Sequence, residues 1–279
     1  MKKWIGLAVV IAVLIQACDK VYPPYMETNN TPTPTDSVVQ KVIIEEFTGH
    51  LCPNCPEGSE VAHQLEHLYP GRVFIISIHA GYFANLQSPN YLTDYRCATG
   101  NELYNVFQPQ SYPIAMINRI LRNGSMLVNK DGWAPLVDSL IHTTPTIKIR
   151  STKQFNPSTS TLQASLDFIF LQNTNKKIMW CAYITEDSLV SYQKNNNSAI
   201  GPTPDIPNFP HNDVLRGSIN GTWGDTLISA PVMAGDTIKK SFQYSFGAVS
   251  WNLNQTHIIV FVYDLDTKQI LQAEKFSVK

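Results

Sequence analysis

The sequence Cys52-Pro53-Asn54-Cys55-Pro56 lies between an apolar run and an amphipathic segment. The run Val42 to Phe47 predicts a buried strand of an α/β sheet, because it is largely apolar on both faces. Beyond the cysteines, apolar residues recur at helical spacing as far as Leu68, and Pro70-Gly71 ends the predicted helix. Two cysteines separated by two residues in this position predict a redox pair or, alternatively, half of a metal site.

The elements that follow extend this beginning into an α/β unit. Arg72 to His79 predicts a second buried strand, parallel to the first across the helix. A third strand from Ile114 to Leu121 is followed by an Asn123-Gly124 turn, which is typical of a β-hairpin, and by a short strand from Ser125 to Val128. A last helix is predicted from Asp131 to His142, with its apolar residues on one side.

The connection over residues 80–111 is much longer than a usual loop between two elements of one sheet. It is rich in Asn, Gln, Tyr and Pro, and contains one weakly helical patch from Tyr91 to Phe107. We expect this insertion either to cover the cysteines or to form a substrate groove beside them.

From Pro145 onward the hydrophobic period is mainly two, which predicts an antiparallel β-sandwich. Residues 191–212 interrupt this pattern with an asparagine run and several prolines, and we expect a long loop there. The predicted strands are Thr146 to Arg150, Leu162 to Leu171, Ile178 to Thr185, Asp225 to Val232, Thr237 to Phe246, Ile258 to Tyr263 and Gln269 to Val278.

The strand, the CxxC turn and Tyr112-Pro113 resemble the active-site strand, cysteine turn and cis-proline loop of thioredoxin-like proteins. More narrowly, Glu45-Glu46-Phe47-Thr48-Gly49, His79-Ala80-Gly81 and the stretch from His211 to Arg216 resemble the Omp28-related outer-membrane lipoproteins of Bacteroidetes. The resemblance covers most of the mature chain. It implies an α/β thioredoxin-like N-terminal domain followed by an all-β immunoglobulin-like sandwich.

In a thioredoxin-like site, the two cysteines carry out thiol-disulfide exchange with different roles. We expect Cys52 to cap a helix opened by Pro53, where free backbone N–H groups and the helix dipole favour a thiolate, and to be the attacking sulfur. Cys55 then resolves the mixed disulfide. Glu46 stands where thioredoxin-like proteins carry a buried acid, and it either relays a proton or escapes to the sheet edge. The resemblance also implies a cis Pro113 whose backbone pairs with an extended substrate.

Several histidines are further candidates for the site, either beside the thiolate or as metal ligands. The neighbouring His50 either stabilises the Cys52 thiolate as a cation or is an ordinary solvent-facing histidine. A metal site would need two further ligands, for which the candidates are His50, His63, His67 and His79. No second CxxC accompanies them, so we expect no metal and no cofactor.

Two cysteines remain in the folded part. Cys97 and Cys181 either form a structural disulfide or, as the apolar surroundings of Cys181 favour, stay apart with Cys181 as a small core residue.

The N-terminus predicts export and membrane attachment. Lys2 and Lys3 precede an apolar run that ends at Ile15, a pattern typical of a signal peptide. Ile15-Gln16-Ala17-Cys18 resembles a bacterial lipobox, which implies that a lipidated Cys18 anchors the mature chain in the outer membrane. The Pro- and Thr-rich residues up to 39 are typical of an extended tether. Whether the protein faces the periplasm or the outside stays open.

The chain is thus predicted to contain a signal peptide (1–17), a tether (18–39), a thioredoxin-like domain (40–143, with the insertion 80–111) and a β-sandwich domain (144–279). Its 21 Lys and Arg nearly balance 22 Asp and Glu, which argues against nucleic-acid binding. Two functions fit this organisation. One is an envelope-anchored thiol-disulfide oxidoreductase acting on exported proteins. The other is a non-catalytic adhesion or scaffold lipoprotein that binds a host or envelope protein through its sandwich and keeps Cys52–Cys55 as a structural disulfide.

Overall fold

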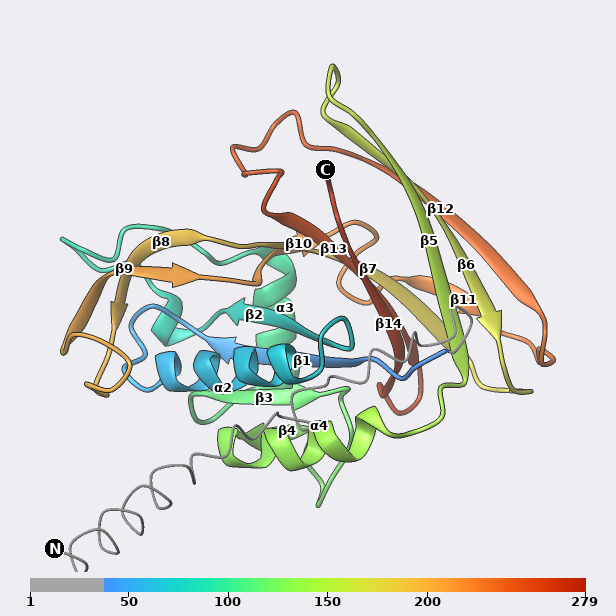
Figure 1. Cartoon of the computed structure of the whole chain (residues 1–279), viewed down its shortest axis with the longest axis horizontal. Helices are drawn as coiled ribbons and strands as arrows, with labels where there is room; N and C mark the ends of the chain where they lie inside the picture. The colour runs from blue at the N-terminus through green and yellow to red at the C-terminus, as the bar shows by residue number, and fades with distance from the viewer. Residues whose placement is uncertain (1–37) are drawn as a thin grey trace, which may run out of the picture. The chain divides into compact units, whose positions relative to one another are not determined.

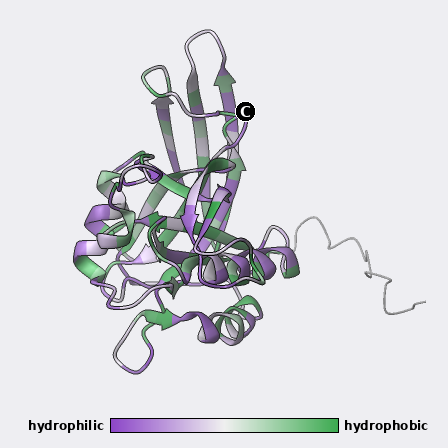
Figure 2. Ribbon diagram, turned by 90° about the vertical axis from the view of Figure 1, so that its left-hand side faces the viewer, coloured by the Kyte–Doolittle hydropathy of each residue, from purple (hydrophilic) through white to green (hydrophobic). Residues whose placement is uncertain are grey.

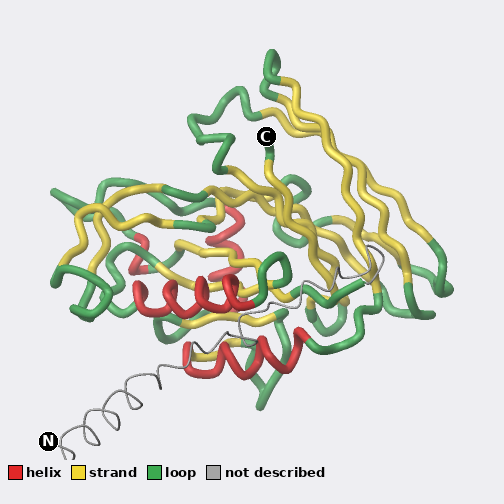
Figure 3. The backbone as a smooth tube through the Cα atoms, in the orientation of Figure 1, coloured by secondary structure: helices red, strands yellow, loops and turns green. Residues whose placement is uncertain are grey.

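The computed structural model describes residues 38–279. The predicted signal peptide, the predicted lipid attachment site Cys18 and nearly all of the predicted tether lie outside the described residues. Figures 1 and 3 show short helices packed on an extensive sheet, and further strands that form separate sheets beside it. The elements in chain order are β1 (Val42–Thr48), α2 (Cys55–Leu68), β2 (Val73–His79), the 3₁₀ turn η2 (Tyr82–Ala84), α3 (Ala98–Phe107), β3 (Ile114–Ile117), β4 (Leu127–Asn129), the 3₁₀ turn η3 (Lys130–Gly132), α4 (Trp133–Ile141), β5 (Ile147–Asn156), β6 (Thr161–Phe170), β7 (Ile178–Glu186), β8 (Leu189–Lys194), β9 (Asp205–His211), β10 (Val214–Ser218), β11 (Asp225–Ile228), β12 (Thr237–Ser245), β13 (Thr256–Asp264) and β14 (Ile270–Ser277).

A mixed nine-stranded sheet organises the structure. Its order is β14-β13-β7-β10-β2-β1-β3-β4, and β11 also pairs with β7. Strands β1 and β2 are parallel, as the sequence predicts, whereas β3 and β4 are antiparallel additions. Strand β10 pairs parallel with β2 and antiparallel with β7, so one sheet contains strands from both sides of the predicted domain boundary at residues 143–144.

Helices cover both faces of the β1–β4 part of this sheet. Helices α2 and α4 share a face, because Leu65 and Trp133 pack in one cluster with Ile44 of β1. Helix α3 lies on the opposite face, where Leu103 packs with Ile43. The alternation of β1 therefore sends even-numbered residues toward α2 and odd-numbered residues toward α3.

The remaining strands form additional antiparallel sheets. Strands β12, β6 and β5 form a three-stranded sheet whose inner face packs against β7, β11 and β13. Along its outer edge, residues of β12 alternate between exposed and half-buried, and Figure 2 shows hydrophilic and hydrophobic residues alternating along these strands. Strands β8 and β9 form a separate two-stranded sheet. The fold class is a mixed α/β sheet with additional antiparallel sheets.

A buried ion pair fixes the α3 side of the sheet. Arg119, which follows β3, bonds both carboxylate oxygens of Glu45, and neither side chain is exposed to solvent. Four aromatic rings surround the guanidinium group, from Phe107, Trp223, Phe261 and Tyr263. Although burial opposes the charge, the Glu45 carboxylate raises the pKa of Arg119. Glu45 thus points away from α2, as the strand alternation predicts.

The prediction of a long loop over residues 191–212 is correct only for its middle, residues 195–204. Strands β8 and β9 occupy the other half of this segment and pair with each other. The pattern is obscured because β9 contains Pro207 and Pro210 and β8 carries polar residues, which a two-stranded ribbon tolerates because one edge of each strand lacks a partner. The turn predicted at Asn123-Gly124 is confirmed, since both residues have positive φ.

None of the helices between residues 38 and 279 is both long and apolar enough to cross a membrane.

Candidate functional site

Cys52 and Cys55 form a disulfide, with their Cα atoms 5.4 Å apart, in the turn between β1 and α2. The Cys55 N–H group donates to the Cys52 carbonyl, so a turn closes before the helix begins. Helix α2 therefore starts at Cys55 with Asn54 as its N-cap residue and Pro56 in its first turn. The prediction that the helix opens at Pro53 and that Cys52 caps it is wrong, because the capping position lies two residues later.

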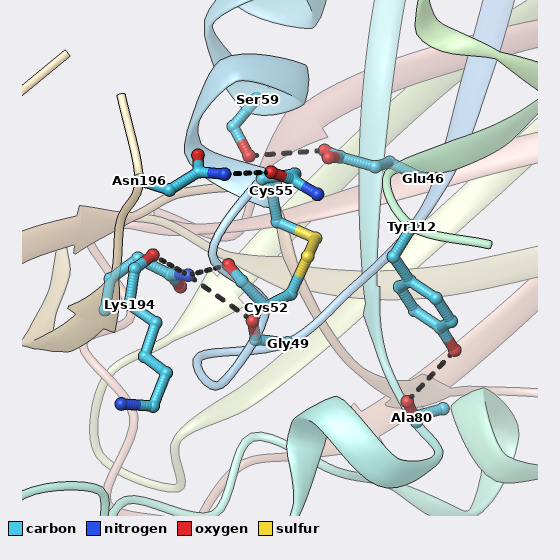
Figure 4. The surroundings of a disulfide bond; sticks show 11 residues. Glu46, Gly49, Cys52, Cys55, Ser59, Ala80, Tyr112, Lys194 and Asn196 are labelled. Atoms are coloured by element: carbon cyan, nitrogen blue, oxygen red, sulfur yellow. Dashed lines mark hydrogen bonds between the residues drawn. A yellow bond between two sulfur atoms is a disulfide. The ribbon is translucent and has the colours of Figure 1, made fainter. Parts of the chain in front are cut away.

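The β8–β9 hairpin holds the cysteine turn by hydrogen bonds. Gln193 Nε2 donates to the Cys52 carbonyl at 2.8 Å and approaches the Gly49 carbonyl at 3.4 Å. The backbone N–H of Lys194 bonds the carbonyl of His50, and that of Asn196 bonds the carbonyl of Pro53. Figure 4 shows Lys194 and Asn196 on one side of the disulfide and Tyr112 on the other. These contacts join segments that lie about 140 residues apart in the sequence.

The insertion over residues 80–111 also covers the site. The Leu51 N–H bonds the Phe83 carbonyl, and the Phe83 ring packs against Tyr112 at a centroid distance of 5.1 Å. A Cβ atom on Gly49 would lie 2.4 Å from the Phe83 backbone, so only glycine permits this approach. Cys52 and Cys55 are each only 1% exposed. The insertion thus packs on the turn that carries the buried cysteines, through Gly49, His50 and Leu51.

Glu46 lies beneath α2 beside the disulfide (Figure 4). Its Oε2 atom accepts a long hydrogen bond of 3.4 Å from Ser59, while Oε1 has no partner within the described part of the chain. Complete burial raises the pKa of Glu46 to about 8, and the charge of His63 opposes this rise. The alternative in which Glu46 escapes to the sheet edge is therefore excluded.

Pro113 packs against the same turn of α2. The Tyr112–Pro113 peptide bond is cis, and Pro113 is buried. A Cβ atom on Gly58 would lie 2.6 Å from Pro113 Cβ and 3.0 Å from Glu46 Oε1. Gly58 thus lets the helix, the proline loop and the buried acid meet.

His50 is buried, which contradicts the expectation of a solvent-facing histidine. Its Nε2 atom lies 2.8 Å from the Asn85 carbonyl, and its side chain is 1% exposed. Burial lowers its pKa, which disfavours the cationic role that was the other alternative. Two further buried histidines, His79 and His211, stack around Tyr95 behind it. Burial also lowers the pKa of both, to about 3 for His211.

His63 belongs to a charged cluster on the outer side of α2. Its Nε2 atom lies 3.4 Å from Asp213 Oδ2, and the Lys275 ammonium bonds Asp213 Oδ1 at 2.8 Å. Among the described residues, His63, Glu66 and Asp213 are the group whose ligand-type atoms lie within 4.8 Å of one another. Of the four histidines weighed as metal ligands, only His63 is in this group, and Lys275 already neutralises Asp213 there.

Cys97 and Cys181 do not bond to each other. Cys97 caps α3, where its sulfur accepts the Gly100 N–H, and Cys181 is fully buried in β7. Burial raises the pKa of both thiols. The reading of Cys181 as a core residue is confirmed.

Sequence reasoning missed Gln193 and Asn196 as neighbours of the cysteines. Both lie in a polar run that lacks a hydrophobic period and was read as a loop. Their position depends on a long-range strand pairing that no local pattern reports.

Removing the Gln193 side chain should expose the disulfide. In Gln193→Ala the buried carbonyl of Cys52 loses a partner, which costs about 1–3 kcal/mol and favours opening of the hairpin. We expect reduction of Cys52–Cys55 by a phosphine to become at least about fivefold faster. Gln163→Ala is the matched control, because Gln163 bonds Gln243 on the surface of the three-stranded sheet. Equal reduction rates in the wild type and both variants would contradict this role.

Glu46 should make the folded state less stable at high pH. A carboxyl group whose pKa is raised on folding stabilises the fold fully below its ordinary pKa, and this contribution is lost as the pH rises through about 8. We therefore expect Glu46→Gln to be more stable than the wild type at pH 8, by more than about 1 kcal/mol, and the difference to shrink toward pH 4. Urea unfolding at several pH values measures it, with the exposed Glu60→Gln as control. A pH-independent difference would refute the burial of an ionisable Glu46.

Comparison with known proteins places the chain in a family. The model of the family "Outer membrane protein Omp28" matches residues 100–279. No curated protein sequence matches the chain.

Solved structures resemble this chain at low sequence identity, and those with TM-scores above 0.5 share its fold. HBP35 of Porphyromonas gingivalis is 16% identical with a TM-score of 0.62, covering 87% of this chain and 76% of that one. A protein of Agrobacterium tumefaciens is 12% identical with a TM-score of 0.51, covering 87% of this chain and 96% of that one. A domain of the outer membrane lipoprotein Omp28 from P. gingivalis is 18% identical with a TM-score of 0.32, covering 49% of this chain and 91% of that domain. Because the family model matches more than half of the sequence, the chain belongs to the Omp28 outer membrane protein family.

Proposed function

We propose that this protein is an envelope-anchored thiol-disulfide oxidoreductase that reduces or rearranges disulfides in exported proteins through Cys52. The observation that carries the proposal is a fully buried Glu46 beside the Cys52–Cys55 disulfide, with Pro113 packed on the same turn of α2 as Glu46. A disulfide that only staples a turn needs neither neighbour. A redox pair needs a group to take the proton of its second thiol.

The proposal includes a thioredoxin-like arrangement for residues 40–143. The parallel β1-α2-β2 unit, the antiparallel β3 and β4, and α4 support it. Strand β10 supplies an additional parallel neighbour to β2 from far along the chain. For residues 144–279 we propose an immunoglobulin-like sandwich, supported by the packing of the three-stranded sheet on β7 and β13.

The proposed location is the outer membrane, with a lipid on Cys18 as the anchor. Membership of the Omp28 family supports this location. The substrates would then be exported proteins with thiols or disulfides, and the sandwich would offer a surface for an envelope or host protein. The side of the membrane on which the site lies is left open by the proposal.

In the reducing direction, the Cys52 thiolate attacks one sulfur of a substrate disulfide, forms a mixed disulfide and releases the other substrate sulfur as a thiolate. Cys55 then gives its proton to the Glu46 carboxylate and attacks the Cys52 sulfur. The Cys52–Cys55 bond forms, the second substrate thiolate leaves, and two electrons have passed to the substrate. An external dithiol must reduce the pair again. Pro113 would position the substrate backbone.

The elements packed around the cysteine turn control how a protein substrate reaches Cys52. In the oxidised pair each cysteine is 1% exposed, so η2 or the β8–β9 hairpin must move before a protein substrate reaches Cys52. This burial is also the one observation that favours a second candidate function. In that function the disulfide is structural, and the protein is a non-catalytic adhesion or scaffold lipoprotein.

Cysteine variants separate the two functions. We expect the wild type to catalyse insulin reduction by dithiothreitol, and Cys52→Ser to reduce the rate to the uncatalysed background. Cys55→Ser should accumulate a mixed disulfide with the substrate, detectable by mass spectrometry, because the resolving thiol is absent. Cys97→Ser, which leaves the pair intact, is the control and should retain the activity. A wild type no faster than Cys52→Ser would favour the structural disulfide.

A further inference from the structure

The sheet face beneath α2 is apolar at one end and polar at the other. Near the start of β1 and β2, Ile44 and Ile75 pack against the helix. Farther along, the same face carries Glu46 and Thr48 on β1 and Ser77 and His79 on β2, which lie opposite each other in register and are at most 6% exposed. Polar groups at a helix–sheet interface are costly to bury, so a cluster of them indicates a function other than packing.

Helix α2 presents a matching set of polar side chains. Ser59, His63 and Glu66 lie four and three residues apart, which places them on one face of the helix. Ser59 contacts Glu46, and His63 contacts Asp213. These contacts form a polar strip from the buried carboxyl group toward the surface, where the His63 side chain is 27% exposed.

A small cavity lies between the two sets. Ser59, His63, Ser77 and His79 are among the residues that line it, together with the end of β9. Its volume of about 10 Å³ suits about one water molecule. The cavity lies between His63 and Ser77, the residue of β2 that pairs with Glu46. Glu46 Oε1 lacks a partner within residues 38–279.

His63 and Glu46 are also linked electrostatically. The hydrogen bond to Asp213 raises the pKa of His63, and the charge of His63 in turn lowers the pKa of Glu46 from the value that burial alone would give. The other titratable or charged groups around Glu46, His63 and Asp213 are Glu66 on α2, His79 on β2, Asp187 after β7, His211 on β9, His257 on β13 and Lys275 on β14.

We propose that His63, oriented by Asp213, is the positioning and proton-relay residue that connects Glu46 with solvent during thiol-disulfide exchange. The inference rests on the proposed oxidoreductase function and adds the route of the proton. Before the transfer the His63 ring is protonated, and its charge stabilises the Glu46 carboxylate. When Cys55 gives its proton to Glu46 and neutralises it, His63 releases its Nδ1 proton to water, Nδ1 being the nitrogen that does not contact Asp213. The ring, now neutral, accepts the Glu46 proton at Nδ1, so that both Glu46 and His63 return to their charged forms. No electrons are exchanged in this step.

The relay is tested first without reference to activity. In protein with ¹³C-labelled glutamate side chains, the Glu46 carboxyl signal is titrated by NMR in the wild type, His63→Gln and His67→Gln. Glutamine keeps a hydrogen-bond donor for Asp213 but carries no charge, so we expect the pKa of Glu46 to rise in His63→Gln. His67 is exposed one turn farther along α2, and its replacement should leave the titration unchanged. Identical Glu46 titrations in all three proteins would overturn the inference.

Exchange kinetics provide the second test. If the pKa of Glu46 rises by about one unit, the rate of Cys55-dependent resolution at pH 7 falls about tenfold in His63→Gln, and it approaches the wild-type rate above pH 9. His67→Gln should follow the wild-type profile. Superimposable profiles for wild type and His63→Gln, with normal Cys52-dependent activity, would reject the relay while leaving the proposed function intact. A wild type without Cys52-dependent activity would reject both.

If His63→Gln does not fold, titration of the wild type alone still shows whether Glu46 and His63 are coupled. A coupled pair requires the Glu46 carboxyl signal to shift at the pH where the His63 ring signals titrate. An independent titration of the two groups in the wild type would overturn the inference.

Discussion

A carboxyl group that is buried beneath a helix, with one oxygen lacking a partner, is the constraint on which the candidate site depends. Glu46 is fully buried between β1 and α2, where the ionised form is costly unless a positive charge compensates it. The residues around Glu46 make room for its carboxyl group and offset the cost of burying it. Gly58 leaves room for the carboxyl oxygen, Ser59 offers a weak hydrogen bond, and His63 supplies a charge that is itself held by Asp213.

The same region joins distant parts of the chain. Asp213 precedes β10, the strand that links β2 to β7, and its backbone carbonyl accepts the Ser77 N–H of β2. The β8–β9 hairpin comes just before it and bonds the cysteine turn through Gln193. The stretch from His211 to Arg216, noted in the sequence for its family resemblance, is thus where the C-terminal half reaches the site. One continuous segment, from β8 to β10, therefore contacts the cysteine turn through Gln193 and also supplies Asp213, which holds His63 near the Glu46 carboxylate.

Sequence reasoning found the parts of this fold whose signal is local. The buried strands β1 and β2, the helix between them and the alternating strands of the C-terminal half each carry a strong hydrophobic period. The hairpin could not be predicted because its strands carry prolines and polar residues such as Gln193, which bonds the Cys52 turn and follows no periodic pattern. His50 was expected in solvent because its neighbours read as a turn, whereas the insertion folds back to bury it. The helix starts at Cys55 and not at Pro53, a difference of about half a turn that only cap geometry resolves.

The reduction potential of the Cys52–Cys55 pair shows most directly whether this disulfide is redox-active or only structural. The protein is equilibrated with defined dithiothreitol or glutathione redox buffers, the thiols are trapped by alkylation, and the reduced fraction is measured by mass spectrometry. If the pair is redox-active, we expect its potential to lie in the range of catalytic pairs, from about −120 to about −270 mV. A potential below about −300 mV, typical of disulfides that serve only structure, would contradict it.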